Sequence, residues 1–168
     1  MSNRKIIGPT GMSMTMIILF LLIGTYLKAQ VNPPRPINLT SSSVQNLSFG
    51  AFAITGSNGG TITVSNTGIR TSTGDIFLIG SDYSYGIFTV ECVEGTTLLL
   101  MNGASAVLSG SNGGNMTITL GETNPPLPYL NTSTTTVFQI GATLYVGPMQ
   151  DNPPGDYNGV YEIIINHE

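Results

Sequence analysis

The stretch Gly110-Ser-Asn-Gly-Gly-Asn-Met-Thr-Ile-Thr-Leu120 decides the fold class, because a Gly-rich turn leads directly into strict alternation of apolar and threonine residues. Asn and Gly tolerate the positive φ that tight turns demand. Apolar residues at every second position predict a strand with one buried and one solvated face. The stretch Gly56-Ser-Asn-Gly-Gly-Thr-Ile-Thr-Val64 repeats the pattern. We interpret this repetition as the independent use of the same turn residues ahead of two strands, with a duplicated half-domain as the alternative.

Short apolar stretches recur between Gly, Asn and Pro residues from Val44 onward, and no window has helical spacing long enough to bury one face. Ten short strands are predicted, over residues 44–49, 51–55, 61–65, 75–79, 86–93, 97–101, 115–120, 136–140, 142–146 and 159–166. Ten strands in one domain are typical of a sandwich of two antiparallel sheets. The sequence therefore predicts an all-β fold, an antiparallel β-sandwich.

Alternation within these strands also predicts which side chains fill the space between the sheets. We expect one core, formed by Phe49, Phe52, Ile62, Val64, Phe88, Val90, Cys92, Met116, Ile118 and Leu144. Cys92 shares a strand face with two of these residues, so we interpret its thiol as a small buried hydrophobe and not as a nucleophile.

The N-terminal segment has the pattern of a secretory signal peptide. Arg4 and Lys5 precede an apolar run at residues 16–23, and small residues follow the run. The run is far shorter than the roughly 20 residues that a membrane-spanning helix needs. We expect residues 1–30 to be cleaved near Ala29 or Gln30, no membrane span in the remainder, and a secreted or cell-surface location.

Residues 31–43 contain three prolines and a serine run without an apolar period, which predicts an extended leader ahead of a sandwich domain at residues 44–168. Ile37 and Leu39 are apolar and two residues apart, as in a strand that fills pockets along an open sheet edge. We expect the leader to engage a neighbouring copy of the chain by strand exchange, and not its own sandwich.

Charge and cysteine content exclude several classes of protein. After residue 30 the chain keeps two arginines and no lysine against nine acidic residues, a net charge of −7. Nucleic-acid binding needs cations that release phosphate counterions, so it is not expected. A single cysteine allows neither an intramolecular disulfide nor a cysteine-based zinc site.

Residues that could carry catalysis are few and scattered. His167 is the only histidine and stands next to the C-terminal residue, so a Ser-His-Asp triad is not expected. The loop 151–156 has two aspartates but lacks the ligand spacing of an EF-hand. The glycine pairs at 59–60 and 113–114 precede strands and not a helix that would hold a phosphate. We expect no enzyme, and no catalytic, cofactor or metal site.

A series of short motifs resembles a known family. These are Leu47-Ser-Phe-Gly-Ala-Phe52, Gly59-Gly-Thr-Ile-Thr-Val64 with Gly68 and Arg70, Phe88-Thr-Val90, Gly114-Asn-Met-Thr-Ile118, Ile140-Gly-Ala-Thr-Leu144 and Pro154-Gly-Asp-Tyr157. In this order they resemble a domain of unknown function common in secreted bacterial proteins, itself similar to spore coat protein U and Csu-type secreted pilins. The resemblance covers about residues 44–166. It implies an immunoglobulin-like sandwich with an extracellular role and no catalytic residues.

Two functions follow from these features. The first is a non-enzymatic extracellular structural protein, a subunit of a surface or fimbria-like filament. The second is a monomeric secreted binding module for carbohydrate or a surface partner, with Tyr83, Tyr85 and Tyr129 as candidate stacking residues beside Asp82. A stacked aromatic pair at one end of the sandwich would favour the second function.

Overall fold

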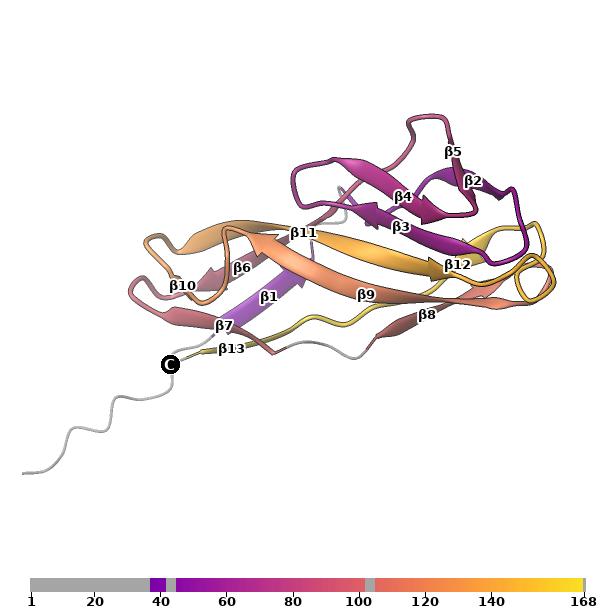
Figure 1. Cartoon of the computed structure of the whole chain (residues 1–168). Coiled ribbons are helices and arrows are strands. Elements are labelled where there is room, and N and C mark those ends of the chain that lie inside the picture. The colour runs from indigo at the N-terminus through magenta and orange to yellow at the C-terminus, as the bar shows by residue number, and fades with distance from the viewer. Residues whose placement is uncertain (1–36, 42–44, 102–104, 168) are drawn as a thin grey trace, which may run out of the picture. The chain divides into compact units, whose positions relative to one another are not determined.

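The computed structural model describes residues 37–41, 45–101 and 105–167, and within these ranges the chain forms thirteen strands and no helix (Figure 1). The predicted signal peptide and the first part of the predicted leader lie outside the described residues. The strands are β1 (Ile37–Ser41), β2 (Ala51–Ile54), β3 (Gly60–Val64), β4 (Arg70–Gly74), β5 (Ile76–Ile79), β6 (Gly86–Cys92), β7 (Thr97–Met101), β8 (Ala106–Gly110), β9 (Asn115–Asn124), β10 (Tyr129–Leu130), β11 (Thr135–Val146), β12 (Tyr157–Asn158) and β13 (Ile164–His167). Every pairing between them is antiparallel, so the predicted fold class is confirmed.

The two stretches that decided the fold class form β3 and β9 as predicted. Ile62, Val64, Met116 and Ile118 are buried, and the threonines between them face outward. The turn ahead of β3 holds Gly59 at a φ of +72°. Local alternation and turn chemistry therefore agree with the final structure at both places.

β11 organises the largest sheet, whose order is β1-β6-β11-β9-β8-β12. The N-terminal half of β11 pairs with β6 and the C-terminal half with β3, while β9 runs along the opposite edge. The register shifts at Gly141, between Ile140 and Ala142. A Cβ atom on Gly141 would lie 2.4 Å from the carbonyl oxygen of Val64, so glycine is what lets β3 approach β11 closely there.

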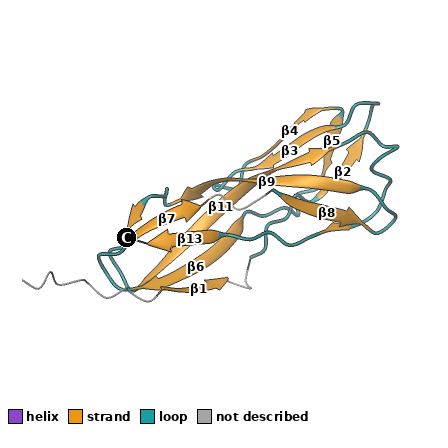
Figure 2. Cartoon of the chain, turned by 90° about the horizontal axis from the view of Figure 1, so that it is seen from below, coloured by secondary structure: helices purple, strands orange, loops and turns teal. Residues whose placement is uncertain are grey.

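Two small sheets complete the domain, one of order β10-β7-β13 and one formed by β2 and β5. Figure 2 shows them at opposite ends. β1 pairs with β6, β2 pairs with β5, and Ser48 forms an antiparallel bridge with Ser84. The bridge lies between the two pairings along the sequence and links the part of the chain ahead of β2 to the part ahead of β6.

The core consists of two clusters and not of the single cluster that we expected. The first contains Phe49, Ile62, Val64, Ile76, Met116, Ile118, Ala142, Leu144 and Val146, and the second contains Phe88, Val90, Cys92, Leu98, Phe138 and Ile140. Leu120 packs against both. The division follows the bulge, because β11 changes its neighbour from β6 to β3 there. Of the ten predicted core residues all are buried except Phe52, which is half-buried.

The prediction that the leader avoids its own sandwich is wrong for residues 37–41. They form β1, which pairs with β6 and sets Ile37 opposite Cys92 and Ser41 opposite Phe88. The three prolines of the leader all precede residue 37, so every residue of β1 keeps its backbone N–H. The edge of β6 offers these N–H groups a ladder partner.

Other strand boundaries also differ from the prediction. The expected strands 136–140 and 142–146 form one bulged strand, β11, and among the described residues 45–49 only Ser48 forms a bridge. The strands β4, β8, β10 and β12 were not predicted. β4 shows why, since its sequence Arg-Thr-Ser-Thr-Gly has no apolar residue and its pairing is provided by β3.

Candidate functional site

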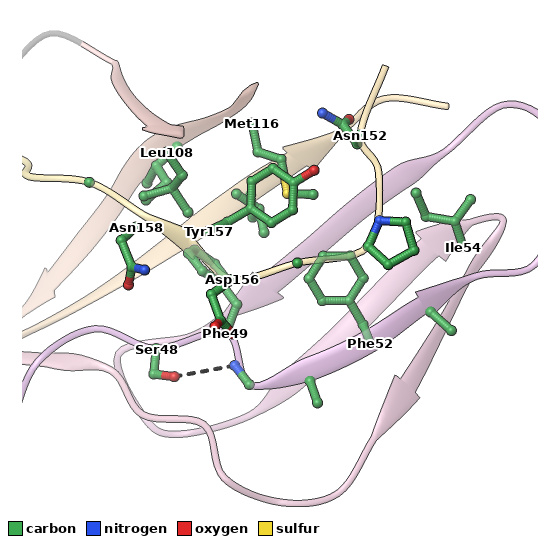
Figure 3. Close-up of a pocket in the computed structure, with 18 of the residues that line it drawn as sticks. Ser48, Phe49, Phe52, Ile54, Leu108, Met116, Asn152, Asp156, Tyr157 and Asn158 are labelled. Atoms are coloured by element: carbon green, nitrogen blue, oxygen red, sulfur yellow. Dashed lines mark hydrogen bonds between the residues drawn. The ribbon is translucent and has the colours of Figure 1, made fainter. Parts of the chain in front are cut away.

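A groove with a volume of about 710 Å³ opens between β2 and the segment 153–161, which contains β12 (Figure 3). Residues 47–54 form one wall and residues 153–161 the other. The side chains of Phe52 and Tyr157 reach into the space from these two walls. The groove therefore lies where two parts of the chain about a hundred residues apart come together.

Both walls are strand edges that lack a neighbouring strand within the described residues. There, β2 pairs only with β5, and β12 pairs only with β8. In an antiparallel ladder, alternate residues direct their N–H and C=O groups to either side of the strand. Each wall consequently presents backbone donors and acceptors to the groove, as an exposed sheet edge does.

The floor of the groove belongs to the first core cluster. Met116 and Ile118 of β9 and Leu144 of β11 line it, with exposed fractions of 3%, 4% and 1%. Phe49 adds a further core side chain from the chain segment ahead of β2. An extended segment laid along this floor would bury its apolar side chains directly against the core.

Hydrogen bonds hold the second wall in place. The Tyr157 hydroxyl donates to the carbonyl oxygen of Pro153 at 2.7 Å. Asn152, only 3% exposed, donates from Nδ2 to the carbonyl oxygen of Asn115 at 2.8 Å. The Asn112 side chain donates to the carbonyl oxygen of Pro154 at 2.7 Å. These bonds fasten the loop ahead of β12 to the turn and strand at 112–115, so this wall is formed before any ligand arrives.

Tyr161 joins the two walls. Its hydroxyl group forms a hydrogen bond with the backbone of Leu47. Burial raises the pKa of Tyr161, and the hydrogen bond to Leu47 opposes that shift in part. Tyr161 of one wall therefore meets Leu47 of the other.

Most of the residues that line the groove are apolar or glycine. They include one carboxylate, that of Asp156, and neither a histidine, a cysteine nor a cation. Ser48 accepts a hydrogen bond from the backbone N–H of Gly50 and has no basic side chain beside it among the lining residues. Apolar side chains and backbone edges are what this arrangement offers a ligand.

The tyrosines considered for sugar stacking lie in different places. Tyr83 and Tyr85 are half-buried and pack against the first core cluster, whereas Tyr129 packs against the second. Tyr129 meets Phe138 edge-on with ring centroids 5.7 Å apart, so its ring serves the core. The structure does not bring the three tyrosines together.

The structure also places the other residues that the sequence analysis considered for catalysis or metal binding. Cys92 is buried in the second cluster, and its burial raises the pKa of the thiol. His167 lies in β13 opposite Leu98. The loop 151–156 contributes to the groove wall. Between residues 37 and 167, as far as the structure describes them, no three His, Cys, Asp or Glu side chains gather as they would around a metal ion.

Sequence reasoning missed the groove itself. Phe49, Phe52 and Tyr157 belong to motifs that were quoted for the family resemblance, yet nothing local to them indicates that they meet around one space. The signal that existed was the pair of motifs at 47–52 and 154–157. Their proximity depends on the pairings of β2 with β5 and of β12 with β8.

Comparison with known proteins gives one match. Residues 39–167 match the family described as a domain of unknown function, DUF4402. The chain belongs to the DUF4402 family. The DUF4402 match starts inside β1, in agreement with the assignment of that strand to the domain. No curated protein and no solved structure matches the chain. None of the described segments is a helix of the length and apolarity needed to cross a membrane.

Proposed function

We propose that this chain is a non-enzymatic extracellular structural protein, a subunit of a surface or fimbria-like filament whose copies are joined by strand exchange. The observation that carries the proposal is the groove between two strand edges with a floor of core side chains. A strand laid there would pair with β2 on one side and with β12 on the other. Its alternate side chains would lie over Met116 and Leu144.

The donor in this proposal is β1 of a neighbouring copy. Within its own chain β1 has one described strand neighbour, β6, whereas the groove offers a neighbour on each side. Each ladder hydrogen bond contributes about 0.5 to 1.5 kcal/mol, so rows on both β2 and β12 would offset the five-residue ladder that β1 gives up on β6. Ile37 and Leu39 share one face of the strand and supply the apolar side chains for the floor. Pairing within the chain has the advantage of high effective concentration, so exchange requires crowded copies.

The location on the bacterial exterior rests on the sequence. The signal-peptide pattern at residues 1–30 supports export, and the resemblance to spore coat protein U and Csu-type pilins supports a surface role. The composition of the groove supports a role without catalysis, because it offers one carboxylate and no partner base.

The test compares monomer and assembled fractions of the chain that starts at residue 31. Light scattering after size-exclusion chromatography measures assembly, and amide hydrogen exchange reports which strand edges become covered. We expect the amides of β2 to gain protection in the assembled fraction. Leu39→Asp should abolish assembly, because a charge would be buried against the floor. Thr40→Asp, one position along and on the other face of β1, is the matched control and should assemble.

Two results would refute the proposal. One is a chain that stays monomeric at high concentration, which would favour the binding module instead. The other is an assembled fraction in which β2 exchanges as fast as in the monomer, because the groove would then be empty.

A further inference from the structure

The β2–β5 sheet is apolar on both faces. Its residues read Ala-Phe-Ala-Ile in β2 and Ile-Phe-Leu-Ile in β5, without one polar side chain. Phe77 is 62% exposed and Ile79 is 45% exposed. Strands β3 and β9, in contrast, place threonines at their outward positions. Continuous apolar strands are typical of sheets that are covered on both sides.

Only one face of this sheet is covered by the chain itself. Phe52, Ile54, Ile76 and Leu78 pack into or against the first core cluster. The outward face consists of Ala51 and Ala53 on β2 and of Phe77 and Ile79 on β5, and we call it the outer patch. Within the described residues the outer patch is open around Phe77 and Ile79, which are both exposed, whereas Ala53 is half-buried. Exposed apolar side chains that gather on one face, and are not scattered singly, are typical of interaction surfaces.

The arrangement of large and small side chains on the outer patch fits a second copy of the chain. Ala51 pairs with Ile79 and Ala53 pairs with Phe77. The two large side chains of β5 therefore form a ridge, and the two alanines of β2 form a lower step beside it. A two-fold axis parallel to the strands would turn a second copy so that its ridge lies over this step. The same operation places this ridge over the step of the second copy, because such a contact uses the same surface twice. β2 and β5 themselves contribute no charged side chain to the patch.

We propose that the outer patch binds the outer patch of a second copy through this two-fold contact, with Phe77 of each copy over Ala53 of the other. The contact goes beyond strand exchange, since it involves the opposite face of β2 from the core and closes at two copies. Sheets packed face to face lie about 10 Å apart, which is the space that one layer of Phe and Ile side chains fills.

The size of the outer patch sets the strength of the contact. Four side chains bury much less than the roughly 800 Å² per partner of a stable interface. We therefore expect weak pairing of free molecules, which becomes effective where copies are already held in rows, as neighbouring filaments would hold them.

Sedimentation equilibrium from micromolar to millimolar protein tests the contact in the Leu39→Asp chain, where strand exchange is blocked. We expect a monomer–dimer equilibrium whose dissociation constant rises at least tenfold in Phe77→Asp. Val137→Asp is the matched control, because Val137 is 53% exposed on β11 and lies outside the patch. If Phe77→Asp and Val137→Asp behave alike, or if the Leu39→Asp chain does not dimerise at millimolar concentration, the inference is wrong.

A second variant separates shape from general stickiness. Ala53→Phe makes the patch more apolar but fills the step, so it should weaken the dimer, whereas non-specific association would strengthen. A stronger dimer in Ala53→Phe would overturn the two-fold contact. Polymers in the Leu39→Asp background would contradict the strand-exchange proposal, and equal association of the Phe77→Asp and Val137→Asp polymers would then contradict the two-fold contact. Circular dichroism checks that each variant is folded.

Discussion

Phe88→Ala is expected to lower the free energy of unfolding by about 4 kcal/mol. Phe88 is 4% exposed and stacks on Phe138, with ring centroids 5.3 Å apart and an interplanar angle of 13°. Removing a core phenylalanine costs about 3 to 5 kcal/mol. Phe138 cannot move into the vacated space easily, because Tyr129 meets it edge-on and it has no exposed surface. The expected loss therefore lies no lower than the middle of that range and is a large share of the roughly 5 to 15 kcal/mol typical of a domain.

Urea unfolding of the chain that starts at residue 31 measures this loss, with circular dichroism as the probe. Phe77→Ala is the matched control, since the same side chain is 62% exposed on β5 and its removal should change stability by no more than about 0.5 kcal/mol. A loss below about 1 kcal/mol for Phe88→Ala, or equal losses for the two variants, would refute the assignment of Phe88 to the second core cluster.

Three further predictions concern the links between the sheets. Arg70 donates to the carbonyl oxygens of Ala51 and Ile79. Arg70→Met should therefore lower the free energy of unfolding, measured in urea, by about 1 to 2 kcal/mol. An unchanged free energy of unfolding would show that water replaces these hydrogen bonds. Gly141→Ala should lower the free energy of unfolding by about 1 to 3 kcal/mol, because the added Cβ would meet the backbone of β3. Thermal unfolding measures this loss, and an unchanged melting temperature would contradict the close approach. Burial raises the pKa of Tyr161 in the folded state, so its contribution is present below the unfolded value near 10 and is lost as pH rises through the folded value. The drop in melting temperature between about pH 9 and 11 should therefore be smaller in Tyr161→Phe than in the parent, and equal drops would place the phenol in water.

The parts of the fold that sequence predicted are those with a local signal. β3 and β9 follow from alternation over a few residues and from the glycine turns ahead of them. β4 has no such signal, because its five residues are polar or glycine and its pairing depends on β3. The error at residues 37–41 has the same origin. The prolines ahead of β1 describe the chain before it, whereas its pairing depends on the edge of β6.

The candidate site divides in the same way. Alternation predicted that Met116, Ile118 and Leu144 are buried, and each of them proved to be a floor residue of the groove. That this floor stays open between two strand edges could not be predicted, since it depends on β12 joining β8 and on β2 joining β5. The absence of polar residues in Ile-Phe-Leu-Ile of β5 was visible in the sequence, but which of its side chains face outward required the register with β2.

The sequence by itself determined the all-β class, the turns, most of the core residues and the family, because each of these depends on residue type and spacing over a short length of chain. Only the tertiary structure decided that the core splits in two, that β1 covers β6, and that a groove remains between β2 and β12. The physical reason is that hydrogen-bond partners in a sheet lie far apart in the chain. The backbone of any strand can pair with any edge of suitable length, so the choice depends on which packing buries the apolar faces of all strands together.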